Sequence, residues 1–201
     1  MNQKKNLFLL ILVFVFLIGG ASVLYDRLGQ DMAPEQLTVQ EPVVQKESVD
    51  PTTETANEPT EPEGIMAPDF TVYDLDGNEV NLSDYYGKPI VLNFWASWCG
   101  PCQMEMPDFD EKHQELGEDV TFLMVNMTDG ARETVEGASA FVAERNYAFP
   151  VFFDTDRNAA AAYGVNSLPT TYFIDAEGYA IAQAIGAIDM EALQRGIDLI
   201  A

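Results

Sequence analysis

One short apolar run, PIVLNFWA at residues 89–96, constrains the fold of this chain more than any other segment. The run has the length of a strand and is apolar at successive positions, so both of its faces must be covered. A second run of this kind, VTFLMV, occupies residues 120–125. Strands buried on both faces occur in sheets that carry helices on each side, and we therefore expect an α/β domain.

The rest of residues 65–201 alternates predicted strands with predicted helices. The turn dipeptides Asp76-Gly77 and Glu177-Gly178 lie between strand-like runs and predict two hairpins. The pattern therefore predicts a central mixed sheet flanked by helices. Besides the two runs above, the expected strands cover residues 70–73, 79–82, 151–153, 170–174 and 179–185, and the expected helices cover residues 101–116, 132–146, 158–163 and 190–200.

Apolar spacing within the predicted helices indicates which side chains face the core. In the first helix these are Met104, Phe109 and Leu116, and in the last helix they are Leu193, Ile197 and Ile200.

Residues 1–25 carry a membrane-targeting pattern. Lys4 and Lys5 precede an uncharged, mainly apolar run over residues 7–25, and about 20 such residues are needed to cross a bilayer as a helix. The two lysines place the N-terminus in the cytoplasm. We expect a single-pass anchor with the C-terminal domain outside the cytoplasm; the alternative is a signal peptide cleaved near Ala21, which would leave a secreted domain.

Residues 26–64 differ in composition from the domain that follows them. They contain no aromatic residue, they are rich in Asp and Glu, and prolines recur through the segment. Such a segment cannot bury enough apolar surface to offset its chain entropy, so we predict a disordered tether between the anchor and the domain at 65–201.

The charge balance and the cysteine count exclude several functions. With 10 Lys and Arg against 33 Asp and Glu, the formal net charge is −23, which disfavours nucleic-acid binding. Two cysteines and one histidine cannot form a disulfide-rich framework or fill a four-ligand zinc site by themselves. We expect neither a metal nor another cofactor.

Both cysteines lie in the segment Trp98-Cys99-Gly100-Pro101-Cys102, where a predicted strand passes into a predicted helix. A helix N-terminus lowers the pKa of a thiol, and the thiolate is the reactive form. Cys99 is therefore expected to be exposed and to attack, while Cys102, one turn further, is expected to be buried and to resolve. A purely structural disulfide is the alternative, but so short a loop gains little stability from one.

These residues resemble the active site of thioredoxin-like proteins, and further segments resemble the membrane-anchored TlpA/ResA-like branch of that family. The core of the resemblance is FWASWCGPC at residues 94–102 with Leu168-Pro169-Thr170. Three segments point to the branch: Glu105-Met106-Pro107, the segment Ala67-Pro68-Asp69-Phe70 with the hairpin after it, and residues 129–149 in the place of a helical insertion. The resemblance implies a thioredoxin-like fold with an N-terminal hairpin extension and that insertion.

The resemblance also implies roles for individual residues. Pro169 is expected to follow a cis peptide bond and to leave the backbone of Leu168 free to pair with a substrate segment beside Cys99. Trp98, Gly100 and Pro101 are expected to contact the substrate.

One residue departs from the pattern of cytoplasmic thioredoxins, which carry a buried Asp where this chain has Asn93. Glu105 is three residues after Cys102 and on the same helix face, so it can exchange a proton with that thiol, as in the TlpA/ResA-like branch. The alternative is that Glu105 is a solvated residue of the first helical turn.

Taken with the resemblance, the sequence predicts an extracytoplasmic thiol-disulfide oxidoreductase that reduces exported proteins and acts as a monomer. The implied partners are a polytopic membrane protein that supplies electrons and a substrate such as apocytochrome c or a methionine sulfoxide reductase.

The alternative functions are an oxidase that installs disulfides, a peroxidase, and a metal or haem-delivery chaperone module. A peroxidase is disfavoured because Ala96 stands where a Thr would be expected and no arginine is near Cys99 in the sequence.

Overall fold

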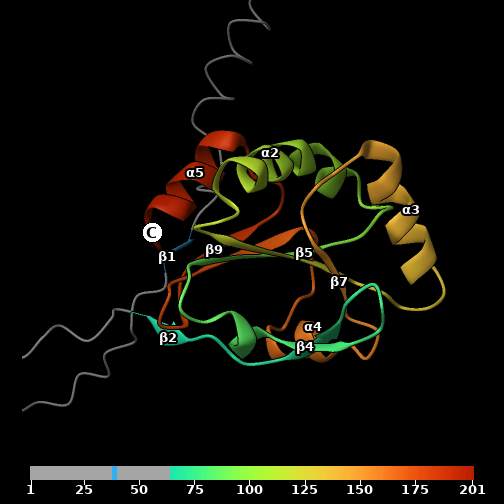
Figure 1. Ribbon diagram of the computed structural model, residues 1–201, viewed down its shortest axis with the longest axis horizontal. Helices are drawn as coiled ribbons and strands as arrows, with labels where there is room; N and C mark the ends of the chain where they lie inside the picture. Colours follow the sequence, from blue (N-terminus) through green and yellow to red (C-terminus); the bar gives the residue numbers. More distant parts are fainter. Residues whose placement is uncertain (1–37, 40–63) are drawn as a thin grey trace, which may run out of the picture. The chain divides into compact units, whose positions relative to one another are not determined.

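The computed structural model describes residues 38–39 and 64–201 (Figure 1). The predicted anchor at 1–25 and nearly all of the predicted tether at 26–64 lie outside the described residues. Within the described part of the chain, no helix combines the length and the hydrophobicity that a membrane crossing needs.

A nine-stranded mixed sheet forms the centre of the domain. Its order is β1-β9-β8-β5-β6-β7-β3-β4, and β2 also pairs with β9. The β5–β6 and β6–β7 pairs are parallel and the other pairs are antiparallel. The strands are β1 (Thr38–Val39), β2 (Ile65–Met66), β3 (Thr71–Tyr73), β4 (Glu79–Asn81), β5 (Ile90–Trp95), β6 (Thr121–Asn126), β7 (Val151–Phe153), β8 (Thr170–Ile174) and β9 (Tyr179–Ile185).

Helices cover both faces of this sheet, and each face has its own apolar core. Figure 1 shows α2 and α5 over one face and α4 on the other. Successive β5 residues point to opposite faces, so Val91 and Trp95 enter the first core while Leu92 and Phe94 enter the second. The helices are α2 (Gly100–Leu116), α3 (Val135–Arg145), α4 (Asn158–Ala162) and α5 (Met190–Asp198), and a 3₁₀ helix, η1, covers Leu82–Tyr85.

The α/β class, the mixed sheet and the two hairpins agree with the sequence prediction. Leu193, Ile197 and Ile200 are buried as predicted, although α5 ends at Asp198, two residues earlier than expected, so Ile200 follows the helix. Met104 is not buried: its side chain is 71% exposed, and the prediction that it faces the core is wrong. The buried face of α2 runs through Cys102, Glu105, Met106 and Phe109, a spacing of three and four residues. Met104 lies off this face.

Helix α3 and strand β1 also differ from the sequence prediction, as do the short elements β2 and η1, which the sequence did not predict. Helix α3 begins at Val135, three residues later than expected, because the Thr134 side chain accepts a hydrogen bond from Gly137 N and caps the helix there. Strand β1 falls within the segment predicted to be disordered. At Thr38–Val39 the chain pairs with β9, opposite Gln183 and Ala182. A sheet edge offers unpaired backbone groups, and a short Thr-Val segment suits such pairing.

Candidate active site around Cys99 and Cys102

The cysteines lie at the junction of the central strand and the first helix. Strand β5 ends at Trp95, helix α2 begins at Gly100, and Cys99 is the N-cap residue of that helix. Cys102 N donates a hydrogen bond to Cys99 Sγ over 3.3 Å. The two residues are joined by a disulfide, with their Cα atoms 5.2 Å apart. The pair is therefore present in its oxidised form at a helix N-terminus, where a released thiolate would be stabilised.

Cys99 is less exposed than the sequence predicts. Its side chain is 5% exposed and that of Cys102 is fully buried. In the oxidised state, the expectation of an exposed Cys99 is therefore wrong, because the disulfide draws its sulfur toward Cys102 and both join the apolar core on that face. Cys99 is still the more accessible of the two cysteines, as predicted, because it borders a surface pocket and Cys102 does not.

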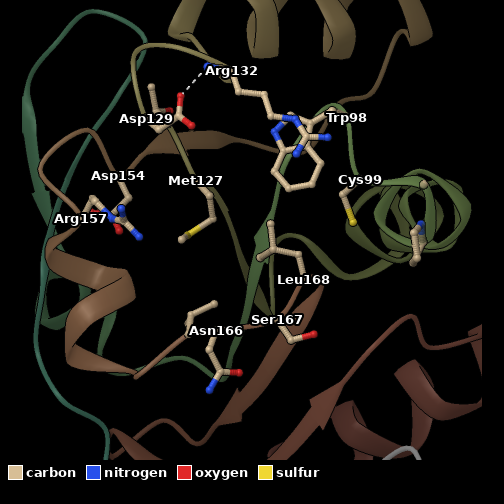
Figure 2. Close-up of a pocket in the computed structure, with 14 residues that line it drawn as sticks. Trp98, Cys99, Met127, Asp129, Arg132, Asp154, Arg157, Asn166, Ser167 and Leu168 are labelled. Carbon is tan, nitrogen blue, oxygen red and sulfur yellow. Dashed lines mark hydrogen bonds between the residues drawn. The ribbon is translucent and has the colours of Figure 1, made fainter.

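This pocket has a volume of about 590 Å³ and opens beside the disulfide (Figure 2). It contains all four residues predicted to contact substrate, Trp98, Gly100, Pro101 and Leu168, together with Cys99. Loops after β6 and β7 and before β8 complete its wall, contributing Met127, Thr128, Asp129, Arg132, Asp154, Arg157, Val165, Asn166 and Ser167.

Pro169 is buried directly behind this wall, and its peptide bond to Leu168 is cis. The Pro169 carbonyl accepts a hydrogen bond from Gly186 N at 2.9 Å, which ties it to the turn after β9. No hydrogen bond from another described residue reaches the backbone of Leu168. The N–H and C=O of Leu168 are therefore available to an extended segment lying in the pocket.

Glu105 lies behind the disulfide, not in the pocket. It is 2% exposed, so the alternative of a solvated first-turn residue is wrong. Its Oε1 accepts from Asn93 Nδ2 at 2.8 Å and its Oε2 accepts from Ile188 N at 3.0 Å. Burial raises the pKa of Glu105 to about 7, although these two hydrogen bonds oppose the shift. A carboxyl group one helical turn from Cys102 can thus gain or lose a proton near neutral pH.

A second buried carboxylate near the site, Glu133, is 1% exposed and was not predicted from the sequence. Its Oε1 accepts from Ser97 N at 2.7 Å and from Asn126 Nδ2 at 2.6 Å, and its Oε2 accepts from Ser97 Oγ at 2.7 Å. Glu133 therefore joins the loop after β6 to the residue just before Trp98 and Cys99. The one sequence signal for this loop is the turn dipeptide Asp129-Gly130, which indicates that the chain reverses direction before α3.

Arg132, on the same loop, is the second residue that was missed. Its guanidinium carbon lies 3.5 Å from the centroid of the Trp98 ring, in a cation–π contact. The prediction that no arginine is near Cys99 is wrong, because the loop after β6 brings Arg132 to the edge of the same pocket. Ala96 still occupies the position three residues before Cys99, where a peroxidase would be expected to carry Thr.

Several known proteins resemble this chain. Residues 64–182 match the family model described as AhpC/TSA family. The thiol-disulfide oxidoreductase ResA of Bacillus anthracis is 38% identical over 134 residues, which make up 65% of this chain and 74% of that protein. The thioredoxin-like protein YneN of Bacillus subtilis is 34% identical over 137 residues, 68% of this chain and 79% of that protein.

A solved structure shares the architecture. The exposed lipoprotein thioredoxin Etrx1 of Streptococcus pneumoniae superimposes with a TM-score of 0.55 and is 36% identical, covering 65% of this chain and 99% of that one. The predicted thioredoxin-like fold is confirmed.

The Glu133 contacts generate a prediction about the stability of the active-site loop. Glu133→Gln keeps the shape of the side chain but turns one accepting oxygen into an NH₂ group that faces the donors of Ser97 or Asn126. We expect the free energy of unfolding to fall by about 1–3 kcal/mol, the cost of leaving buried polar groups unpaired. Urea denaturation of the oxidised protein measures the change.

Ser97→Ala is the matched control, because it removes only the Oγ donor and leaves the carboxylate with two donors. Its expected loss is smaller, about 1 kcal/mol. Equal stability of Glu133→Gln and wild type would contradict the assigned role.

Proposed function

The chain belongs to the AhpC/TSA family and is a thiol-disulfide oxidoreductase of the thioredoxin-like type, and from this premise we propose that it reduces disulfides of exported proteins. The observation that carries the proposal is the placement of Cys99, which joins Cys102 in a disulfide and borders a pocket that Leu168 also lines. The backbone of Leu168 makes no hydrogen bond with another described residue. A polypeptide segment paired with Leu168 lies beside the reactive sulfur.

The reaction requires only the two sulfurs and no cofactor. In the reduced protein, the Cys99 thiolate attacks one sulfur of the substrate disulfide, a mixed disulfide forms, and the other substrate sulfur leaves as a thiolate. Cys102 then loses its proton and attacks Cys99 Sγ, which re-forms the Cys99–Cys102 disulfide and releases the second substrate sulfur. Two electrons pass to the substrate, and both of its sulfurs end as thiols.

Glu105 is proposed to exchange the proton of Cys102 in the second step. Cys102 is fully buried, and burial resists ionisation of a thiol. Asn93 has no acidic group, so the carboxyl of Glu105 is the base that the buried face of α2 offers, three residues from Cys102. A group with a pKa of about 7 can both accept this proton and return it at neutral pH.

The same carboxyl group supports the proposed direction of the reaction. A strongly oxidising pair owes its potential to a stabilised thiolate in the reduced form. Here the charged form of Glu105 repels a thiolate on the same helix face, which favours the disulfide and hence a protein that donates electrons. The Gly-Pro dipeptide between the cysteines, in place of a His, points the same way.

The place of action is proposed to be outside the cytoplasm, with residues 1–25 as the anchor and residues 26–64 as the tether. The lysines before the apolar run support this orientation, and the pneumococcal relative is described as an exposed lipoprotein.

The domain is proposed to act as a monomer. Each cycle leaves the pair oxidised, so a dithiol donor must reduce it again, and a polytopic membrane protein is the proposed donor. Apocytochrome c and methionine sulfoxide reductases are the proposed kinds of substrate.

The reduction potential of the Cys99–Cys102 pair tests the direction. We expect a value near that of thioredoxin, about −270 mV, because the negative charge of Glu105 on the same helix face opposes a thiolate at Cys102 in the reduced form. Equilibration with glutathione or dithiothreitol buffers, read from the fluorescence of Trp95 and Trp98, measures it. A value near about −120 mV would instead assign the protein to disulfide formation.

The order of the two cysteines has its own test. Cys102→Ser is expected to accumulate mixed disulfides through Cys99, because attack proceeds and resolution cannot. Cys99→Ser is the matched control and should trap no substrate, since Cys102 is fully buried. Non-reducing gels of protein incubated with oxidised substrate separate the two results, and trapping by Cys99→Ser alone would reverse the assignment.

Glu105→Gln tests the proton exchange. The wild-type rate of substrate reduction should rise between pH 6 and 8, as a group with a pKa of about 7 loses its proton. Glu105→Gln should be slower at neutral pH by about a hundredfold or more, the usual contribution of a general base. Stopped-flow profiles measure both proteins, and superimposable curves would eliminate the role of Glu105.

Stability provides the control for this variant. The pKa of Glu105 is higher in the folded protein than in the unfolded chain, so its contribution to stability is present at low pH and lost as the pH rises through about 7. From pH 5 to 8, the unfolding free energy of the wild type should fall relative to Glu105→Gln by about 3 kcal/mol. A change of this sign shows that the variant is folded and that the buried acid titrates.

A further inference from the structure

The pocket beside Cys99 contains more than the sulfur and the Leu168 backbone. Figure 2 shows Cys99 and Trp98 on one side, Asp154 and Arg157 on the opposite side, and Met127 between them. Met127, Val165 and Leu168 give the pocket an apolar surface. It therefore has room for side chains on both sides of a substrate cysteine.

Two guanidinium groups border this pocket in a domain that is otherwise strongly acidic. Residues 64–201 contain six Lys and Arg against 23 Asp and Glu. Arg132 stands above Trp98, and Arg157 stands across the pocket from Cys99. Two of the six cations of the domain thus lie at one small site.

These two are also the cations that lack an oxygen partner among the described residues. Neither guanidinium makes a hydrogen bond or an ion pair with a described residue, and the guanidinium of Arg132 lies over the Trp98 ring. The other four cations each have an oxygen partner: Lys88 with the Glu118 carbonyl, Lys112 with Glu115, Arg145 with the Phe141 carbonyl and Glu144, and Arg195 with Glu191.

The two carboxylates of the pocket are already engaged with backbone donors. Asp129 Oδ1 accepts from the N–H groups of three successive residues, 131–133. Asp154 is 2% exposed, and its oxygens accept from Ala159 N and Ala160 N at the start of α4. Both carboxylates hold loops in place. Backbone hydrogen bonds and, to a lesser degree, the positive charge of Arg132 keep the pKa of Asp129 below its usual range, so Asp129 and Arg132 attract each other. They form no ion pair among the described residues, and the N–H groups of both guanidiniums stay available to an incoming anion.

We propose that this pocket selects polypeptide substrates that carry an acidic side chain close to the disulfide to be reduced. The inference rests on the proposed reductase function and names the substrate class of the same site. The segment pairs with Leu168 beside Cys99, its apolar side chains contact Met127 and Val165, and a carboxylate on either side of its cysteine meets Arg132 or Arg157. Elsewhere the acidic surface of the domain repels such a segment, so the arginines fix where it docks.

Reduction of matched peptides tests the selection. Three short synthetic peptides share one internal disulfide and differ only in the residues flanking it, which are Glu, Gln or Lys. The wild type should reduce the Glu peptide with a kcat/KM roughly two- to tenfold above that of the Gln peptide, the range of exposed ion pairs. The Lys peptide should be the poorest. The preference should shrink in about 1 M salt, because the Debye length falls to about 3 Å and exposed charge pairs are screened.

The variants Arg132→Gln, Arg157→Gln and the double variant locate the effect. We expect each single variant to lose part of the preference for Glu over Gln and the double variant to lose all of it. Arg132→Lys should retain most of it, because the charge remains. Arg195→Gln is the matched control: it removes one positive charge from α5, outside the pocket, and should leave the preference unchanged.

Binding separates the inference from the function on which it rests. A redox-inactive protein with both Cys99→Ser and Cys102→Ser binds linear versions of the three peptides without chemistry, and isothermal titration gives their Kd values. If the wild type reduces no peptide but the inactive protein binds the Glu peptide most tightly, the reductase proposal fails and the selection stands. Equal Kd values for all three peptides, or a preference that survives in the double arginine variant, would falsify the selection.

Discussion

Strand β5 is the element on which the active site depends. Both of its faces are buried, and it pairs along its length with β6 on one side and β8 on the other. Because β6 runs parallel to β5 and β8 runs antiparallel, the end of β6 and the start of β8 lie at the same edge as the end of β5. Trp95 is opposite Asn126, and Phe94 is opposite Thr170. The topology therefore brings the cysteine loop, the loop after β6 and the cis-proline turn together.

Two buried carboxylates then hold this edge, and neither has an ion-pair partner among the described residues. Glu133 accepts three hydrogen bonds and fixes Ser97, the residue before Trp98, to the loop after β6. Glu105 accepts two and joins α2 to the segment before α5. Hydrogen bonds from neutral donors stabilise a buried carboxylate without neutralising it. Hydrogen bonds rather than cations thus hold Glu105 and Glu133, and through them the disulfide and its pocket stay in position.

The sequence predicts the elements of the fold and the redox pair, but not the contacts between distant loops. Apolar periodicity predicts β5, β6 and the helices, since burial repeats with the geometry of each element. The cis bond before Pro169 followed from resemblance alone. Glu133 was missed because its partner Ser97 is 36 residues away and because a Glu in a polar loop ordinarily faces solvent. Arg132 was missed for the same reason, since its position over Trp98 exists only once the β6 loop folds back.

Asn93 on β5 and Glu105 on α2 together occupy the place where cytoplasmic thioredoxins carry a buried Asp on the strand: Asn93 supplies a hydrogen-bond donor and Glu105 supplies the acid. Asn93 Nδ2 donates to Glu105 Oε1 at 2.8 Å and to Thr171 Oγ1 at 3.0 Å. An Asp at this position would put a second carboxylate against the first, and two such groups cannot both ionise without a large cost. The amide therefore permits the one acid to sit on α2, near Cys102. The same carboxyl group also accepts from Ile188 N. If it exchanges the proton of Cys102 as proposed, its protonation also changes a contact that holds the segment before α5, and one titrating group would serve both the resolving step and the packing of α5.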